Sequence, residues 1–508
     1  MGAERLAPRL ALLGVLATPV IVAAASPGSA AQNLAQHGAP GITACATCHG
    51  QAGEGNAAAG YPRLADLPGA YLAAQLAALA DGTRQSAVMG PLARALGAAQ
   101  RSALAAYYAS LPVAVAPGNA ASAAGVGFDA RLALYGRWSD GVPPCVQCHG
   151  SAGGGIGSAF PPLTGQPERY LDSQLRAWRA GLRHGDPLEL MQGIAQRLSD
   201  QDMLAVSGYF AALPASPAGV SATPAPPMSP AAAGGGAEGR SFVPASHAVA
   251  DDAFGRQVRA GERIFDDTGH QARRFVGNTL RCSDCHLDQG RRVGSAPLWA
   301  AYVSYPAYRS KNHHVNTFAE RLQGCFRYSM NGTAPPLGNP VLVALETYAY
   351  WMALGAPLDP HIAGRGYPKL PKPVRPANYA RGARLYAEDC ALCHGPNGEG
   401  QPDRAGEPAF PALWGADSYN WGAGMADIPN VAGFVKANMP LSRAGLLSDQ
   451  QAWDVALYVD SQERPQDPRF TGSVADTRRR FHDGEDSMYG RAVNGQVLGS
   501  HSVPPGGP

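Results

Sequence analysis

The sequence predicts an all-α protein of four small helical units, arranged as two halves joined by a flexible linker. Four Cys-x-x-Cys-His runs are spread over the 508 residues, and each is followed by apolar residues at helical spacing. A stretch rich in Pro, Ala, Gly and Ser, from 216 to 239, separates the second run from the third and lacks apolar periodicity. A chain of this length is expected to hold about three or four domains.

The four Cys-x-x-Cys-His runs hold eight of the nine cysteines. Two thiols three residues apart can add to the two vinyl groups of one porphyrin, and the histidine that follows can bind its iron. A redox dithiol or half of a zinc site could use the same spacing, but four runs that all end in histidine favour c-type haem. The sequence therefore predicts four covalent haem c groups, attached to Cys45, Cys48, Cys145, Cys148, Cys282, Cys285, Cys390 and Cys393, with iron ligands His49, His149, His286 and His394.

The start of the chain has the order of a secretory signal peptide. Arg5 and Arg9 come first, a mostly apolar run of about 16 residues follows, and small residues lead to Ala30 and Ala31. The run is shorter than the roughly 20 residues that span a bilayer, so we expect residues 1–31 to be cleaved, with an uncleaved anchor as the alternative. Because haem c is attached outside the bacterial cytoplasm, we expect a periplasmic protein with no stable membrane span.

Composition excludes some function classes. The chain is 45% hydrophobic, largely through alanine, and only 8% aromatic, so each unit has a thin protein core and haem must supply much of the buried apolar surface. A net charge of +2 gives no support for a nucleic-acid partner.

The first two units, 32–118 and 119–215, are copies of one pattern. Each has a Gly-rich loop after its motif, an amphipathic helix and a closing aromatic helix. Met89 and Met191 start a shared Met-x-x-(Leu or Ile)-Ala-x-x-Leu pattern, 40 and 42 residues after the motif histidines. A thioether at this place can fill the sixth position of a haem iron. The alternatives are adaptable core packing and, in the second unit, Met203.

The second half follows the linker, predicted as 216–250. Gly261 and Gly382 precede its two motifs and would let a helix cross closely over residues 344–355 and 451–462, as in class-I cytochrome c units. In the fourth unit Met439, 45 residues after the motif histidine, is preferred over Met425 as the ligand. The predicted ranges are 251–358 for unit three, 359–376 for a connector, 377–467 for unit four and 468–508 for a disordered tail.

The ninth cysteine, Cys325, lies 39 residues after His286, where the other units have methionine. A free thiol is a liability in an oxidising compartment, so we expect Cys325 to be an iron ligand and a nucleophile toward sulfur. A buried packing cysteine is the alternative. The competing iron ligands are His313, His314 and Met330.

Basic residues gather around this thiol. Residues 256–330 contain 12 Arg and Lys against 6 Asp and Glu, a net of +6. Guanidinium groups offer paired donors that suit an oxyanion such as a sulfonate, so we expect a pocket for small dianions; a surface for docking a protein partner is the alternative. The candidate residues are Arg309, Lys311, Arg321, Arg327 and Ser329.

Several runs carry a family resemblance. RCSDCHLDQG, APLWAAYVSYPAYRSK, ERLQGCFRYSMNGTAPP, CALCHGPNGEG, FPALWG and NMPL, within about 251–469, resemble the di-haem thiosulfate dehydrogenases that form tetrathionate. The part up to about residue 214 resembles di-haem cytochromes of the c-four type, which serve some such enzymes as electron acceptors. The resemblance implies a natural fusion of acceptor and enzyme that couples two thiosulfates with the loss of two electrons.

The resemblance also implies residue roles. Cys325 would bind iron and carry a sulfur adduct, and Arg321 and Ser329 would contact the substrate, with Arg309 and Lys311 beside them. Some members have lysine before the second methionine ligand, where this chain has Asn438, so a lysine-for-methionine exchange is not expected here.

Thiolate ligation lowers a haem potential relative to His/Met ligation. Electrons would therefore pass from the third unit to the fourth, then to the first half, and on to a downstream redox protein or terminal oxidase. Two other functions use similar motifs: a Sox-type enzyme that conjugates thiosulfate to a carrier protein, and a cytochrome that only transfers electrons.

Overall fold

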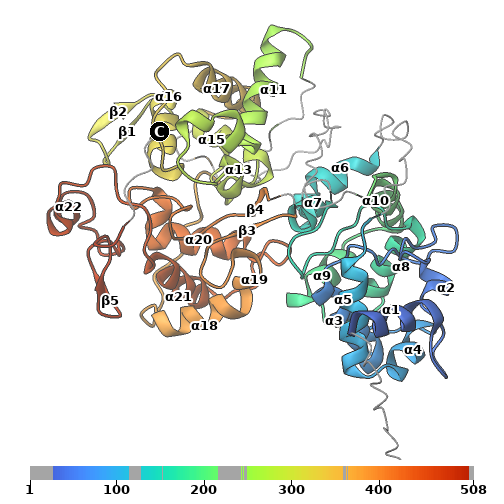
Figure 1. The fold of residues 1–508 in the computed structure, drawn as a ribbon. Helices are drawn as coiled ribbons and strands as arrows, with labels where there is room; N and C mark the ends of the chain where they lie inside the picture. Colours follow the sequence, from blue (N-terminus) through green and yellow to red (C-terminus); the bar gives the residue numbers. More distant parts are fainter. Residues whose placement is uncertain are drawn as a thin grey trace, which may run out of the picture.

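The computed structural model describes residues 27–113, 128–150, 153–215, 242, 244, 249–358, 362, 364–404 and 406–502. Figure 1 shows the first half, in blue to green, on one side of the molecule and the second half, in green to red, on the other. The predicted signal peptide up to residue 26 and the linker core 216–241 lie outside the described residues. The helix of the first unit that precedes its motif begins at Pro27.

The two units of the first half repeat the same helix order. In each, a short helix carries the motif, and a longer helix packs on the closing helix of its unit. The first unit contains α1 (Pro27–His37), α2 (Ala46–His49), α3 (Gly69–Asp81), α4 (Met89–Ala95) and α5 (Ala98–Ser110). The second contains α6 (Phe128–Tyr135), η1 (Trp138–Asp140), α7 (Cys145–His149), α8 (Glu168–Arg179), η3 (Pro187–Glu189), α9 (Leu190–Ala195) and α10 (Asp200–Ala212).

Two glycines let the first and last helices of each later unit cross at close range. A Cβ on Gly261 would lie 2.1 Å from the carbonyl oxygen of Ala344, and one on Gly382 would lie 2.1 Å from that of Asp454. Only a residue without a side chain fits at such distances. The predicted crossings are confirmed, between α11 (Ala253–Asp266) and α17 (Pro340–Ala353), and between α18 (Tyr379–Asp389) and α21 (Asp449–Asp460).

Short elements complete the second half, including small hairpins that an all-helical pattern does not reveal. The third unit adds α12 (Thr268–Gln271), η4 (Arg273–Phe275), α13 (Cys282–Cys285), α14 (Leu287–Gly290), α15 (Leu298–Tyr302), β1 (Ala307–Arg309), β2 (His314–Asn316), α16 (Phe318–Gly324) and η5 (Cys325–Ser329). The fourth adds α19 (Ala391–His394), β3 (Gln401–Pro402), β4 (Pro408–Phe410), η6 (Gly424–Ala426) and α20 (Ile428–Asn438). Strand β1 pairs with β2, and β3 with β4, both antiparallel.

Units three and four share one hydrophobic core. Trp299 and Tyr348 of the third unit belong to the same buried cluster as Trp421 and Trp453 of the fourth. A shared core of aromatic side chains holds two units more firmly than a polar contact would, because it removes a large apolar area from water. The second half is therefore one body rather than two tethered units.

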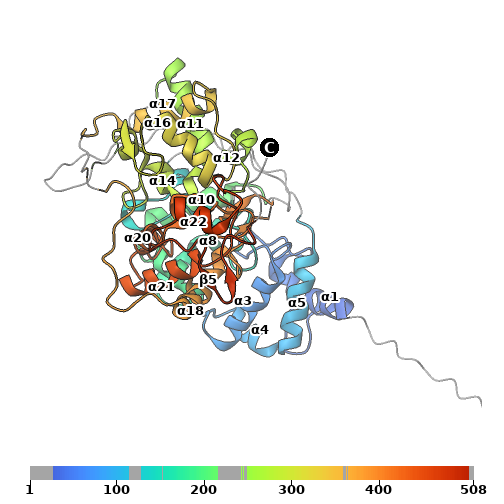
Figure 2. The same ribbon diagram turned by 90° about the vertical axis from the view of Figure 1, so that its left-hand side faces the viewer.

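The C-terminal segment differs from the disordered tail expected after 467. Residues 468–502 form α22 (Val474–Phe481) and the hairpin of β5 (Ala492–Val493) with β6 (Gln496–Val497), and they lie along the fourth unit (Figures 1 and 2). The buried Tyr489 ring packs edge-on against Trp421 at 5.5 Å, and its hydroxyl donates to Gln466 Oε1 at 3.0 Å. The expectation of disorder came from the polar composition of this segment. Buried hydrogen bonds such as that of Tyr489 order the segment, and no apolar periodicity in the sequence predicts them.

No helix among the described residues is both long and apolar enough to cross a bilayer.

Candidate active site and haem-binding pockets

All four motif histidines are oriented by the same kind of hydrogen bond. In each, ring Nδ1 contacts a backbone carbonyl, which can only accept, so Nδ1 carries the proton and Nε2 keeps a lone pair for iron. Burial lowers the pKa of each imidazole, which favours the neutral ring that binds metal. The pairs are His49 with Pro62 (2.9 Å), His149 with Pro161 (2.8 Å), His286 with Ala296 (2.7 Å) and His394 with Pro411 (2.9 Å).

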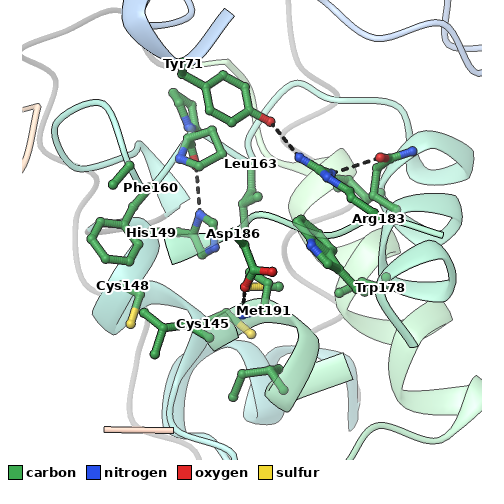
Figure 3. A pocket seen from close by; sticks show the side chains of 18 of the residues that line it. Tyr71, Cys145, Cys148, His149, Phe160, Leu163, Trp178, Arg183, Asp186 and Met191 are labelled. Atoms are coloured by element: carbon green, nitrogen blue, oxygen red, sulfur yellow. Dashed lines mark hydrogen bonds between the residues drawn. The ribbon is translucent and has the colours of Figure 1, made fainter. Parts of the chain in front are cut away.

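The pocket of the second unit shows how these groups converge. Figure 3 shows His149, Met191 and the sulfur atoms of Cys145 and Cys148 around one cavity, which is also lined by apolar side chains such as Phe160. The backbone N–H of Met191 donates to Asp186 at 2.6 Å, which fixes the loop that carries the thioether. This donor set, in an apolar slot, fits haem c.

Other methionines occupy different surroundings. Met203, the competitor in the second unit, is fully buried in the protein core on α10. Met425 packs against the hydrophobic cluster shared by units three and four. Met89 is half-buried at the start of α4, and Met439 is half-buried directly after α20. The surroundings agree with the preferred choices, and ligation by Met89, Met191 and Met439 stays a prediction.

Cys325 opens a single turn of π-helix, η5, that continues α16. The N–H of Met330 donates to the carbonyl of Cys325 at 2.9 Å, five residues back. Such wide turns are rare and often occur at functional sites. The turn is pinned at its far end, where a Cβ on Gly332 would lie 2.0 Å from the carbonyl oxygen of Phe275.

Two arginines converge on this cysteine. Arg321 Nη1 donates to Cys325 Sγ at 2.9 Å, and the cysteine sulfur, as thiolate, raises the pKa of the Arg321 guanidinium. Arg309 lies near the same place, because a Cβ on Gly324 would be in ordinary van der Waals contact with both guanidinium groups, 3.7 Å from Arg309 Nη1 and 4.0 Å from Arg321 Nη1. The charges of Arg321 and Cys325 both act on Arg309. Strand β1 thus brings Arg309 to the same place as Arg321.

Lys311 lies in the turn between β1 and β2. Its Nζ donates to the carbonyl of Gly422 in the fourth unit and stands 4.0 Å from the centroid of the Tyr328 ring. Burial, followed by the charge of Arg469, lowers the pKa of Lys311 to about 7. Lysines whose pKa is lowered to near neutral pH are often found at functional sites.

The remaining sequence candidates are not all brought together. Arg327 is exposed, and so are His313 and His314 on the hairpin. Met330 is 3% exposed within the core. Ser329 is half-buried, and its carbonyl accepts from Asn278 Nδ2 at 2.9 Å.

Sequence reasoning missed the groups that brace the site from outside the third unit. The buried Asn420 donates through Nδ2 to the carbonyl of Arg327 at 3.0 Å, and its own N–H donates to that of Tyr328 at 3.2 Å. Arg469, from the segment beyond the fourth unit, stands 5.3 Å from the Tyr328 ring centroid. The residues in these contacts lie about a hundred or more positions apart in the sequence. No local sequence pattern could therefore predict the contacts.

The two halves meet beside two haem motifs. Phe160 of the second unit contacts Phe410 of the fourth, with ring centroids 5.4 Å apart. Both belong to a small buried cluster against which Cys148 and Cys393 pack. The second and fourth motifs are therefore neighbours in space, although 245 positions separate those cysteines in the sequence.

Comparison with known proteins agrees with this architecture. The cytochrome c family matches residues 37–112, 143–214 and 379–463, which leaves the Cys325 unit outside the matched ranges. The thiosulfate dehydrogenase of Thiomonas intermedia is 54% identical over 301 residues, covering 59% of this chain and 96% of the relative. The thiosulfate dehydrogenase electron acceptor of the same organism is 47% identical over 178 residues, covering 35% of this chain and 82% of the relative.

One solved structure matches nearly the whole chain. The thiosulfate dehydrogenase (TsdBA) of Marichromatium purpuratum has a TM-score of 0.84 and 44% identity, and the match covers 94% of this chain and 100% of that one. Family membership and the cysteine motifs together show a multihaem cytochrome that binds haem c covalently. The chain belongs to the thiosulfate dehydrogenase family, with an acceptor-like half and a dehydrogenase-like half fused in one polypeptide.

Proposed function

We propose that this protein oxidises thiosulfate, joining two molecules into tetrathionate with the release of two electrons, and that Cys325 is the reacting residue. The observation that carries the proposal is that Arg321 donates to Cys325 Sγ while Arg309 lies near the same guanidinium, next to Gly324. The names of the relatives, which are thiosulfate dehydrogenases and their electron acceptor, support the substrate.

Charge neutralisation is the first task of such a site. Two thiosulfate dianions repel one another, so their sulfur atoms can meet only where fixed cations offset the charge. Arg309 and Arg321 would supply paired donors for one sulfonate group, and Ser329, at the end of the π-helix that Cys325 opens, would add a hydroxyl. Because these groups are partly withdrawn from water, their attraction for an anion is stronger than on an open surface.

The covalent step uses the thiolate of Cys325. Its sulfur and the sulfane sulfur of one thiosulfate form an S–S bond, and two electrons leave this sulfur pair. Bound haem c supplies the one-electron acceptors that this oxidation needs. The sulfane sulfur of a second thiosulfate then attacks the sulfane sulfur of the adduct, which breaks the bond to Cys325, releases tetrathionate and restores the thiolate. Arg321, donating to Sγ, stabilises the thiolate as the leaving group.

Electrons would leave through the shared interface of the halves. The contacts around Phe160 and Phe410 place the fourth motif beside the second, which supports a route from unit three to unit four, then to unit two and unit one. From there a periplasmic redox protein or a terminal oxidase would accept them.

Turnover of the purified holoprotein tests this function. Thiosulfate should reduce the haems without any carrier protein, and an artificial acceptor should sustain turnover with tetrathionate as the product. Sulfur appearing only on an added carrier protein would point to a conjugating enzyme. Four haems that stay oxidised in thiosulfate would point to a cytochrome that only transfers electrons. Either result overturns the proposal.

A further inference from the structure

A second group of cations lies next to the arginine pair at Cys325. The Tyr328 ring, on the π-helix, has Lys311 Nζ 4.0 Å from its centroid and Arg469 Cζ 5.3 Å from it. Lys311 comes from the β1–β2 hairpin, and Arg469 comes from the segment after the fourth unit. Two separate parts of the fold thus bring a cation to one aromatic ring, which the π-helix carries.

The position of Arg469 is fixed by a buried carboxylate. Asp467, fully buried, accepts from Arg469 Nε at 3.0 Å and from Nη2 at 2.6 Å. The same carboxylate accepts from His482 Nε2 at 2.8 Å. Among the hydrogen bonds of the described residues, none uses Arg469 Nη1, so one edge of the guanidinium is available to a ligand.

Lys311 has no carboxylate partner of its own among the described residues. It donates to the carbonyl of Gly422, and only Asp467, already shared by Arg469 and His482, offsets its charge. Lys311 is half-buried, and an ammonium partly withdrawn from water without a counter-ion of its own is costly. An anion bound between Lys311 and Arg469 would remove that cost.

The number of charges matches the chemistry of the reaction. Arg309 and Arg321 suffice for one sulfonate, and Lys311 and Arg469 form a separate pair of cations close enough to influence them. Tetrathionate carries a sulfonate at each end. The product, and the pair of thiosulfates that forms it, therefore needs two anion subsites.

We propose that Lys311 and Arg469, both beside the Tyr328 ring, form a second sulfonate subsite that holds the second thiosulfate and the far end of tetrathionate. This inference rests on the proposed function. It assigns a substrate-binding role to the segment beyond residue 467, and it explains why a polar tail is folded against the enzyme half.

Arg469→Gln in the full-length holoprotein tests the subsite. Removal of one charge-assisted contact should raise KM for thiosulfate and for tetrathionate roughly ten- to a hundredfold. Haem reduction by a single equivalent of thiosulfate, which fills only the first subsite, should keep the wild-type rate. Arg469→Lys should recover part of the lost affinity.

Arg478→Gln is the matched control, because Arg478 lies in the same segment and, within the part of the chain that the structure describes, its side chain donates only to the carbonyls of Ser487 and Tyr489. An equal rise in KM for this control would mean that loosening of the segment, and not a lost subsite, is responsible. An unchanged KM in Arg469→Gln would also overturn the inference while leaving the proposed function intact. The proposed function itself is tested separately, by whether wild-type protein turns thiosulfate over to tetrathionate without a carrier protein.

Discussion

Arg404 and Asp66 form an ion pair across 338 positions of the chain, with Arg404 Nη2 2.7 Å from Asp66 Oδ1 and Nη1 3.0 Å from the Asp66 carbonyl. Both side chains are about four-fifths buried. The pair fastens the fourth unit to the first, next to the aromatic contact between units four and two. Specific contacts thus help to set the position of the acceptor-like half.

Breaking this pair should slow electron transfer between the halves. Arg404→Asp places two carboxylates together, so the N-terminal haems should be reduced several-fold more slowly after mixing with thiosulfate, while the haems of the second half keep their rate. Adding Asp66→Arg should restore the pair, since residues in contact couple by about 0.5–3 kcal/mol. Stopped-flow absorption spectra of the single and double variants measure the reduction rate of the N-terminal haems. If the double variant does not recover the wild-type rate, this ion pair does not hold the two halves together for electron transfer.

Cys325→Met should separate haem binding from catalysis. A thioether can stand where the thiolate stands with little change in volume, so the protein should keep four haems and its fold. Turnover should collapse, because methionine cannot form the S–S adduct, and the potential of one haem should rise toward those with His/Met ligation. Cys325→Gly should instead give a high-spin or water-ligated haem. Near-normal turnover of the methionine variant would remove Cys325 from the catalytic role.

Thiosulfate binding should weaken as pH rises through about 7. Burial and Arg469 lower the pKa of Lys311 to that value, with Arg309, Arg321 and Asp467 as the other charges that face it. The side chain is therefore charged below pH 7 and neutral above it, so KM should increase on the alkaline side. Lys311→Arg should flatten the profile, because a guanidinium stays protonated throughout. A profile unchanged by this substitution would contradict the assignment.

Two methionines of the second unit should respond differently to the same change. Met191→Leu removes the predicted thioether ligand, and the absorption and potential of one haem should lose their His/Met character. Met203→Leu, in the core, should leave every haem spectrum unchanged and cost less than about 1.5 kcal/mol in stability. The opposite pattern of spectra would move the ligand to Met203.

Gly261→Ala should destabilise the third unit. Its new methyl group would lie 2.1 Å from the carbonyl oxygen of Ala344, so α11 must move away from α17 at a cost of about 1–3 kcal/mol or more. Gly269→Ala is the control, since nothing lies within 4 Å of a Cβ at that position. Thermal unfolding followed at the haem absorption compares the two, and equal midpoints would show that the helices do not need this glycine.

Features that depend on short spacing were predictable from the sequence. The cysteine motifs, the helix crossings at Gly261 and Gly382, and the basic character around Cys325 each follow from neighbouring residues or a repeated pattern. The contact of Lys311 with Gly422, 111 residues away, does not. The role of Asn420 and the fold of the C-terminal segment were missed for the same reason, because polar residues acquire partners only once distant parts of the chain have met.

The hydrogen bond from each motif histidine to a carbonyl joins residues only 13, 12, 10 and 17 positions apart, in units one to four respectively. A contact this local can form as soon as one unit's stretch of chain is available, before the rest of the protein is made. Contacts within each unit therefore determine that Nε2 is the imidazole nitrogen with a lone pair left to bind iron. Maturation can accordingly proceed unit by unit along the emerging chain, because each motif histidine is oriented by a partner from its own unit.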